Sequence, residues 1–230
     1  MKVRLIFLVT SVLLVSIISS CDDSTPEGSF VDTPLNLGAT TEWDNESCGI
    51  DIYPCPPYGT RLYQTVRDIP FLGANEAAMD IADNSGIAHL QYFYKLYEQG
   101  YQMLMISTTT GWCEHCAAQM DTMPQMVELY GHLSDDPQVA FLVVVEEDEA
   151  LEWASLDFAG EYSDLHNMGD SVPVTNDPGG SFYQLMTSTS YPFNLYIDLS
   201  DMTIFAYSSA LETVELFSSE LDDLLSQLEK

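Results

Sequence analysis

Basic side chains are scarce in this sequence. Six Lys and Arg residues stand against 36 Asp and Glu residues in a chain of 230, giving a formal charge of −30 at pH 7. Such a surface repels nucleic acid and anionic headgroups, so the composition argues against nucleic-acid binding. It could favour basic partner proteins, but an acidic surface with few lysines also suits a protein in salty water. The charge therefore does not identify a partner.

The sequence also lacks an apolar run of the roughly 20 residues that a permanent membrane-spanning helix needs. The apolar run from Leu5 to Ile18 is shorter, follows Lys2 and Arg4, and ends in small residues. This order is typical of a cleaved secretory signal, and we predict a signal peptide over residues 1–20. Its removal would leave four basic residues against 36 acidic ones, a formal charge of −32.

Cys21 follows this signal in the tetrapeptide Ile18-Ser19-Ser20-Cys21. The tetrapeptide resembles the bacterial lipobox, which implies that Cys21 is lipidated and becomes the mature N-terminus. The implied location is extracytoplasmic, with a lipid anchor in a bacterial membrane and the protein on its periplasmic side. The alternative is an ordinary cleaved signal peptide with an incidental cysteine, which would leave an unpaired thiol in an exported protein.

Two segments precede the main domain. Residues 21–45 are rich in small and polar residues, cannot bury enough apolar surface to fold alone, and are predicted to be a flexible tether. In the lead-in segment, residues 46–75, Cys48 and Cys55 bracket a short loop. Cysteines this close usually pair in an oxidising compartment, so we predict a structural disulfide. The alternative is a second redox couple that relays electrons to Cys113.

The remaining pattern predicts an α/β domain over residues 76–230. A turn and alternating residues before Gly73 predict an N-terminal hairpin extension. Beyond it we expect a central mixed β-sheet flanked by helices. The predicted strands are Gln102–Ser107, Val139–Val145, Val172–Thr175, and a hairpin of Phe193–Ile197 with Met202–Tyr207; the predicted helices are Ala117–Leu133, Glu149–Phe158 and Leu211–Leu228.

Cys113 and Cys116 are the candidate redox centre. They lie where the first of these strands meets a helix, so both sulfurs fall on the first helical turn, close enough to bond. The helix N-terminus stabilises a thiolate, which makes Cys113 the nucleophile and Cys116 the resolving cysteine. His115 can stabilise that thiolate whereas Glu114 opposes it, so the dipeptide leaves the direction of electron flow open.

The motif Gly111-Trp112-Cys113-Glu114-His115-Cys116 resembles the active site of the thioredoxin superfamily, and Ser190-Tyr191-Pro192 resembles its cis-proline loop. The likeness is greatest to extracytoplasmic redoxins of the TlpA/ResA type. It implies a thioredoxin-like fold, a cis Pro192 against the cysteine pair, a Tyr191 backbone that binds an extended client, and Trp112 covering the site.

The same resemblance implies a membrane-tethered thiol-disulfide oxidoreductase. Its expected partners are extracytoplasmic proteins with cysteines or disulfides, and a membrane redox partner that resets Cys113 and Cys116. No cofactor is expected beyond the redox-active disulfide itself. Two positions depart from the family: Ser107 stands where thioredoxins have a buried aspartate, and Gln119 where TlpA/ResA-type proteins often have a glutamate. No familiar proton acceptor for Cys116 is therefore in place.

Other chemistries fit the sequence less well. A closed zinc site needs four ligands, and no second Cys-x-x-Cys or close histidine pair is present, so we expect no metal. Met120, Met123 and Met126 lie at helical spacing beside the cysteines and could hold cuprous copper, although such methionines usually fill a core. The alternative to an enzyme is a copper-handling lipoprotein or a non-catalytic binding module on the same fold.

Overall fold

The computed structural model describes residues 48–49 and 52–228. The predicted signal peptide, Cys21 and the tether lie outside the described residues. The elements in chain order are β1 (Pro70–Leu72), α1 (Glu76–Asp80), β2 (Ile87–His89), α2 (Leu90–Leu96), η2 (Tyr97–Gln99), β3 (Met103–Thr110), α3 (Glu114–Tyr130), β4 (Val139–Glu147), α4 (Leu156–Leu165), β5 (Val174–Asn176), η3 (Tyr183–Leu185), β6 (Phe193–Asp198), β7 (Thr203–Ser209) and α5 (Val214–Leu228). In this part of the chain no helix is long and apolar enough to span a membrane.

The central sheet has five strands in the order β5-β4-β3-β6-β7. Strands β3, β4 and β5 are parallel, whereas β6 is antiparallel to both β3 and β7. The predicted mixed sheet and the hairpin across residues 198–201 are therefore confirmed. Strands β3 and β4 are buried almost throughout, which explains why their sequences are apolar without alternation.

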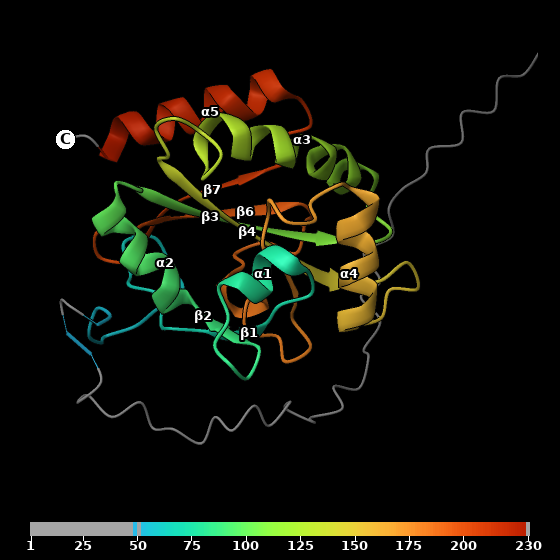
Figure 1. Cartoon of the computed structure of the whole chain (residues 1–230), viewed down its shortest axis with the longest axis horizontal. Coiled ribbons are helices and arrows are strands. Elements are labelled where there is room, and N and C mark those ends of the chain that lie inside the picture. Colours follow the sequence, from blue (N-terminus) through green and yellow to red (C-terminus); the bar gives the residue numbers. More distant parts are fainter. Residues whose placement is uncertain (1–47, 50–51, 229–230) are drawn as a thin grey trace, which may run out of the picture. The chain divides into compact units, whose positions relative to one another are not determined.

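Side chains of each strand alternate between two cores. One core lies between the sheet and α2 with β1, and contains Leu104, Ile106, Leu142 and Val144. The other lies between the sheet and α3, α4 and α5, and contains the neighbouring residues of the same strands. Figure 1 shows α3 and α5 together over one face of the sheet and α1 and α2 on the opposite side. We call these the α3 face and the α2 face.

The lead-in segment differs from the predicted hairpin. Among the described residues before Gly73 no two strands pair with one another; β1 instead pairs antiparallel with β2, which follows helix α1. The alternating residues contact the main sheet through an isolated bridge from Thr65 to Thr203. Their apolar side chains face the core of the domain, since Val66 and Ile69 are buried there. Cys48 and Cys55 form a disulfide, with 5.0 Å between their Cα atoms.

The predicted helix at residues 149–158 is wrong in position, because α4 begins at Leu156. The Asp148 carboxylate accepts hydrogen bonds from the amides of Ala150 and Glu152, which fixes a turn where the helix was expected. Ser155 is the N-cap of α4, its hydroxyl accepting from the Phe158 amide. Helix α3 begins three residues earlier than predicted and continues through Pro124.

Candidate active site

Cys113 and Cys116 form a disulfide at the junction of β3 and α3. Cys113 is the N-cap of α3, and its Sγ accepts a hydrogen bond from the Cys116 amide over 3.1 Å. The residue is 8% exposed, whereas Cys116 is fully buried. The helix therefore directs an amide at the Cys113 sulfur, which is the arrangement that stabilises a thiolate. Cys113 is therefore the more exposed residue of the pair.

The Tyr191-Pro192 peptide bond is cis, as predicted from the sequence. The loop precedes β6, whose first residue, Phe193, pairs with Thr108 of β3. Because β3 and β6 are antiparallel, Pro192 and Tyr191 continue this pairing toward the end of β3 from which the Cys113 turn begins. The fold thus brings the two distant motifs to the same end of the sheet.

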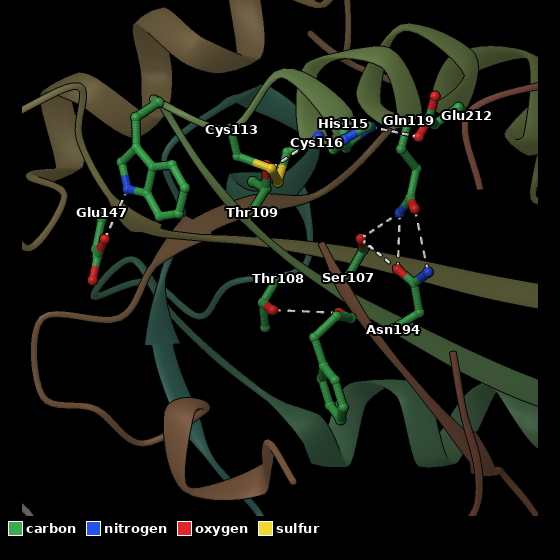
Figure 2. Close-up of a disulfide and its surroundings, with 12 residues drawn as sticks. Ser107, Thr108, Thr109, Cys113, His115, Cys116, Gln119, Glu147, Asn194 and Glu212 are labelled. Carbon is green, nitrogen blue, oxygen red and sulfur yellow. Dashed lines mark hydrogen bonds and ion pairs between the residues drawn. A yellow bond between two sulfur atoms is a disulfide. The ribbon is translucent and has the colours of Figure 1, made fainter. Parts of the chain in front are cut away.

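Trp112 is held between these motifs. Its Nε1 donates a hydrogen bond of 2.8 Å to a Glu147 carboxylate oxygen, and its ring meets Tyr191 edge-on at a centroid distance of 6.0 Å. The indole remains 45% exposed. It is therefore placed as a half-exposed apolar wall beside Cys113, and Glu147 of β4 fixes its orientation (Figure 2).

His115 makes its contact away from the disulfide. Its Nδ1 lies 2.6 Å from a carboxylate oxygen of Glu212, in the segment that leads into α5, and the imidazole is 71% exposed. Figure 2 shows His115 and Glu212 side by side, beyond Cys116 from Cys113. The sequence predicts that His115 acts on the Cys113 thiolate. In the structure the Glu212 carboxylate competes for this imidazole, and the sequence did not predict that contact.

No protein-family model and no curated protein matches the chain. Solved structures do match. A hypothetical protein from Sinorhizobium meliloti 1021 gives a TM-score of 0.52 at 11% identity, covering 74% of this chain and 85% of its own. A Bacteroides thetaiotaomicron protein provisionally assigned as a protein disulfide isomerase gives 0.50 at 17% identity, covering 75% and 93%. A Chlorobium tepidum protein provisionally assigned as the thiol:disulfide interchange protein DsbE gives 0.50 at 14% identity, covering 73% and 98%.

The chain has a thioredoxin-like fold. The predicted fold class is confirmed, and the thioredoxin-like domain carries its disulfide where β3 meets α3. Identities this low establish the architecture, so the chemistry of this thioredoxin-like site has to be argued from its own residues.

Below the disulfide, on the α3 face, three polar side chains form a closed network that we call the neutral triad: Ser107, Gln119 and Asn194 (Figure 2). Ser107 Oγ donates to Asn194 Oδ1 over 2.8 Å, and Gln119 Nε2 donates to both of those oxygens at 2.8 Å. Gln119 Oε1 accepts from the Asn194 amide and from the Leu211 backbone amide. All three side chains are fully buried, and none is ionisable.

The neutral triad explains the two departures from the family pattern together. Ser107 and Gln119 are the two residues at which the sequence departs from the families it resembles, and here they satisfy each other through Asn194. The sequence singled out the first two but missed Asn194, which lies 75 residues beyond Gln119. The one sequence signal for Asn194 was its polar side chain at a position of β6 that faces the core.

A second polar cluster lies at the same end of the sheet and was missed by sequence reasoning altogether. Glu146, near the end of β4, is fully buried, and its carboxyl interacts with that of Asp177, which is itself 3% exposed. Burial, reinforced by the negative charges of Asp177 and Glu147, raises the pKa of Glu146 to about 10. Glu146 is therefore a neutral carboxylic acid at pH 7.

The methionines do not surround the disulfide. Met120, Met123 and Met126 are buried in the core on the α3 face together with Phe217 and Leu221 of α5. This packing favours the core-filling role over copper binding. Within the described ranges, no group of three or more His, Cys, Asp or Glu side chains is arranged to hold a metal ion.

Proposed function

We propose that this protein is a thiol-disulfide oxidoreductase that exchanges disulfides with extracytoplasmic proteins through Cys113 and Cys116. One observation carries the proposal: an N-cap cysteine, disulfide-bonded to a more deeply buried cysteine one turn on, lies at the sheet end to which the cis Pro192 loop leads. The two solved neighbours assigned to disulfide chemistry share this fold and add support.

The exchange proceeds in two displacement steps. The Cys113 thiolate attacks a client disulfide, forms a mixed disulfide, and releases one client sulfur as a thiolate. Cys116 then attacks Cys113 Sγ, which reforms the intramolecular disulfide, breaks the mixed one and releases the second client sulfur. Two electrons pass from the cysteine pair to the client, and the reverse sequence oxidises a client dithiol. Sulfur atoms carry the electrons, so the reaction needs no organic cofactor.

The surroundings of Cys113 suit an extended client. Trp112 offers a half-exposed apolar wall, and Tyr191 lies against its edge beside the cis peptide bond. We propose that a client chain lies along Tyr191 with its cysteine facing Cys113, and that Pro192 shapes this groove. The Trp112 indole would then be partly covered by the client.

The lipobox resemblance supports a location at a bacterial membrane, with Cys21 as the anchor. A protein held there is out of reach of soluble cytosolic reductants, so a membrane redox partner has to reset Cys113 and Cys116. Labelled fatty acid should be incorporated by the wild-type chain and not by Cys21→Ala. Incorporation into both would remove the anchor from the proposal and leave the exchange chemistry untouched.

Trapping tests the exchange itself. In a Cys116→Ala variant the mixed disulfide cannot be resolved, so clients should accumulate covalently bound to Cys113. In Cys113→Ser they should not, and a Cys48→Ser, Cys55→Ser double variant with an intact redox pair should exchange normally. A Cys113→Ser protein with full activity in cells would instead support the non-catalytic binding module.

The direction of exchange follows from the reduction potential of the Cys113-Cys116 pair. A reduction potential of about −270 mV, measured against a glutathione buffer, would identify a reductase. A potential of about −120 mV would identify an oxidant that makes disulfides.

A further inference from the structure

Two pairs of aromatic side chains lie partly exposed at the end of the sheet that carries Cys113. Trp112 meets Tyr191 edge-on, and Trp153 meets Tyr183 edge-on, each pair with 6.0 Å between its ring centroids. Both indoles are 45% exposed, and the Tyr183 ring is 37% exposed. Exposed apolar side chains that lie next to one another, unlike scattered ones, mark a contact surface.

Glu147 joins the two pairs. One of its carboxylate oxygens accepts the Trp112 indole N–H over 2.8 Å. Its backbone pairs with that of Trp153 in an antiparallel bridge, so the two side chains leave the bridge on the same side. Tyr191 lies close by as well, since burial raises the pKa of its phenol most and neighbouring groups that include Glu147 and Tyr183 raise it further. We call this set the aromatic frame: Trp112, Glu147, Trp153, Tyr183 and Tyr191.

A bulge in β4 gives Glu147 its position in the frame. Thr109 pairs with Val145, but the next residue, Thr110, pairs with Glu147, so Glu146 is an extra residue in the strand. Glu146 stays fully buried, whereas Glu147 is partly exposed. Bulges are frequent beside active sites, where they redirect a side chain. This one directs a carboxylate out of the core beside the redox turn.

The turn that follows Glu147 packs directly against the redox motif. The Gly111 amide donates to the Glu147 carbonyl over 2.8 Å. A Cβ atom on Gly111 would lie 3.0 Å from the Glu149 amide nitrogen and 3.1 Å from the Asp148 carbonyl carbon, so the two backbones are in contact. Glu149 and Glu152 are exposed on this turn. In the described part of the chain, ion pairs involve histidine alone, so no Lys or Arg neutralises these carboxylates.

Aromatic rings around a carboxylate suit a cationic side chain. The face of an indole or phenol ring attracts a positive charge, and the attraction grows when the pair is shielded from water. The Glu147 carboxylate supplies the counter-charge; Trp112 occupies one of its oxygens, and the other can accept from a client. Among protein side chains, Lys and Arg provide such a cation, and the planar guanidinium of Arg also stacks on aromatic rings.

We propose that the aromatic frame binds an Arg or Lys side chain of the client, and that the protein thereby selects clients with a basic residue near their reacting cysteine. The assignment rests on the proposed redox function of Cys113 and Cys116. Trp112 directly precedes Cys113, whose sulfur has to reach bonding distance of the client sulfur. The basic residue therefore stands about two residues from the client cysteine, because each extended residue spans about 3.3 Å.

The test compares two peptide disulfides that differ in one charge. Each is a disulfide-linked dimer of a short peptide that carries either Arg or its uncharged isostere citrulline two residues from the cysteine. The reduced full-length protein in about 50 mM salt should reduce the Arg peptide about tenfold faster than the citrulline peptide. The citrulline peptide reports exchange without recognition of charge, so the ratio of the two rate constants isolates the frame. At about 500 mM salt the ratio should fall to about threefold.

Three variants locate the preference in the frame. Glu147→Gln keeps an acceptor for the Trp112 indole but removes the charge, so the ratio should fall to about one. Trp153→Leu removes a ring and keeps apolar bulk, so the ratio should fall to about threefold. Glu98→Gln removes one exposed carboxylate from η2, which precedes the opposite end of β3, and should leave the ratio at about tenfold.

The outcomes separate the frame from overall charge and from the redox function. A wild-type ratio within about twofold of one would overturn the assignment and leave disulfide exchange standing. A ratio that Glu147→Gln leaves unchanged would also overturn it. So would an equal loss of preference in Glu98→Gln, because the selection would then come from the net charge of the protein. A wild-type protein that reduces neither peptide would refute the redox function itself, and with it the assignment.

Discussion

Two buried polar clusters lie near the same end of β3. One consists of neutral side chains and the other contains carboxyl groups. The neutral triad joins Ser107, Gln119 and Asn194 so that every donor and acceptor is matched. The cluster around Glu146 brings two buried carboxyl groups together, those of Glu146 and Asp177, and the pKa of each is raised mainly by burial.

The difference separates a hydrogen-bonded neutral network from a pair of titratable groups. A satisfied buried network stiffens the core and resists change. A buried carboxyl whose pKa is raised makes stability depend on pH. The triad therefore holds α3, β3 and β6 together beneath Cys116. Variants that interrupt the first cluster should lower stability, and variants of the second should change its pH dependence.

The largest effect is expected from interrupting the neutral triad. Gln119→Leu removes all four side-chain hydrogen bonds of Gln119, leaves the Leu211 amide without its partner, and takes hydrogen bonds from Ser107 and Asn194 in the core. We expect the free energy of unfolding to fall by about 4 kcal/mol, measured by urea denaturation. The exposed Gln184→Leu should change it by less than about 0.5 kcal/mol. A loss below about 1 kcal/mol for Gln119→Leu would show that the triad is not the structural member of the comparison.

The next effect concerns the pH dependence of stability at Glu146. Its pKa is raised in the folded protein, so the folded state binds more protons than the unfolded state between about pH 4.5 and pH 10. Stability is thus greatest below the ordinary carboxyl pKa and declines as pH rises. Relative to Glu146→Gln, wild type should lose about 3 kcal/mol between pH 4.5 and pH 7. Urea denaturation of both proteins at the two pH values checks this, and parallel pH curves would contradict a buried neutral Glu146.

A third variant makes one cluster resemble the other. Gln119→Glu places an acid in the neutral triad, where an ionised carboxylate can no longer donate to Ser107 or Asn194. We expect a loss of about 2 kcal/mol at pH 7 that largely disappears at pH 4.5, because the protonated acid regains one donor. The measurement is again urea denaturation at both pH values. A loss that is the same at both would show that shape, not charge, excludes a carboxylate there.

Local sequence predicted the Cys113-Cys116 motif better than the surroundings of Glu146, for a physical reason. The motif and the β6-β7 hairpin depend on residues that are adjacent in the chain, and both were predicted. The cis Pro192 bond was predicted from the resemblance of its loop to that of the thioredoxin superfamily. Glu146 and Glu147 are also adjacent, yet one is fully buried and the other binds Trp112 at the surface. The bulge in β4 that separates their environments depends on pairing with β3, which no local pattern encodes.

Long-range contacts set the remaining limits. Ser107 and Gln119 were recognised as departures, but their common partner Asn194 becomes visible only when β6 pairs beside β3. The helix predicted at residues 149–158 failed because Asp148 and Ser155 compete for backbone amides as turn and cap residues. The strands of the sheet were predictable from local sequence, whereas the start of α4 and the polar contacts between elements were not.

The smallest expected effect concerns the exposed contact between Glu212 and His115, which lies outside both buried clusters. Glu212 binds His115 over 2.6 Å at an exposed position, so Glu212→Gln should change stability by less than about 0.5 kcal/mol. Without that partner the imidazole is free to turn toward Cys113 and stabilise its thiolate. We expect the equilibrium with glutathione to favour the reduced protein by about threefold more than in wild type. Glu215→Gln on the same segment should have no effect. In a His115→Ala background the Glu212 substitution should also have none; a shift there would mean that Glu212 acts on the disulfide through its charge alone.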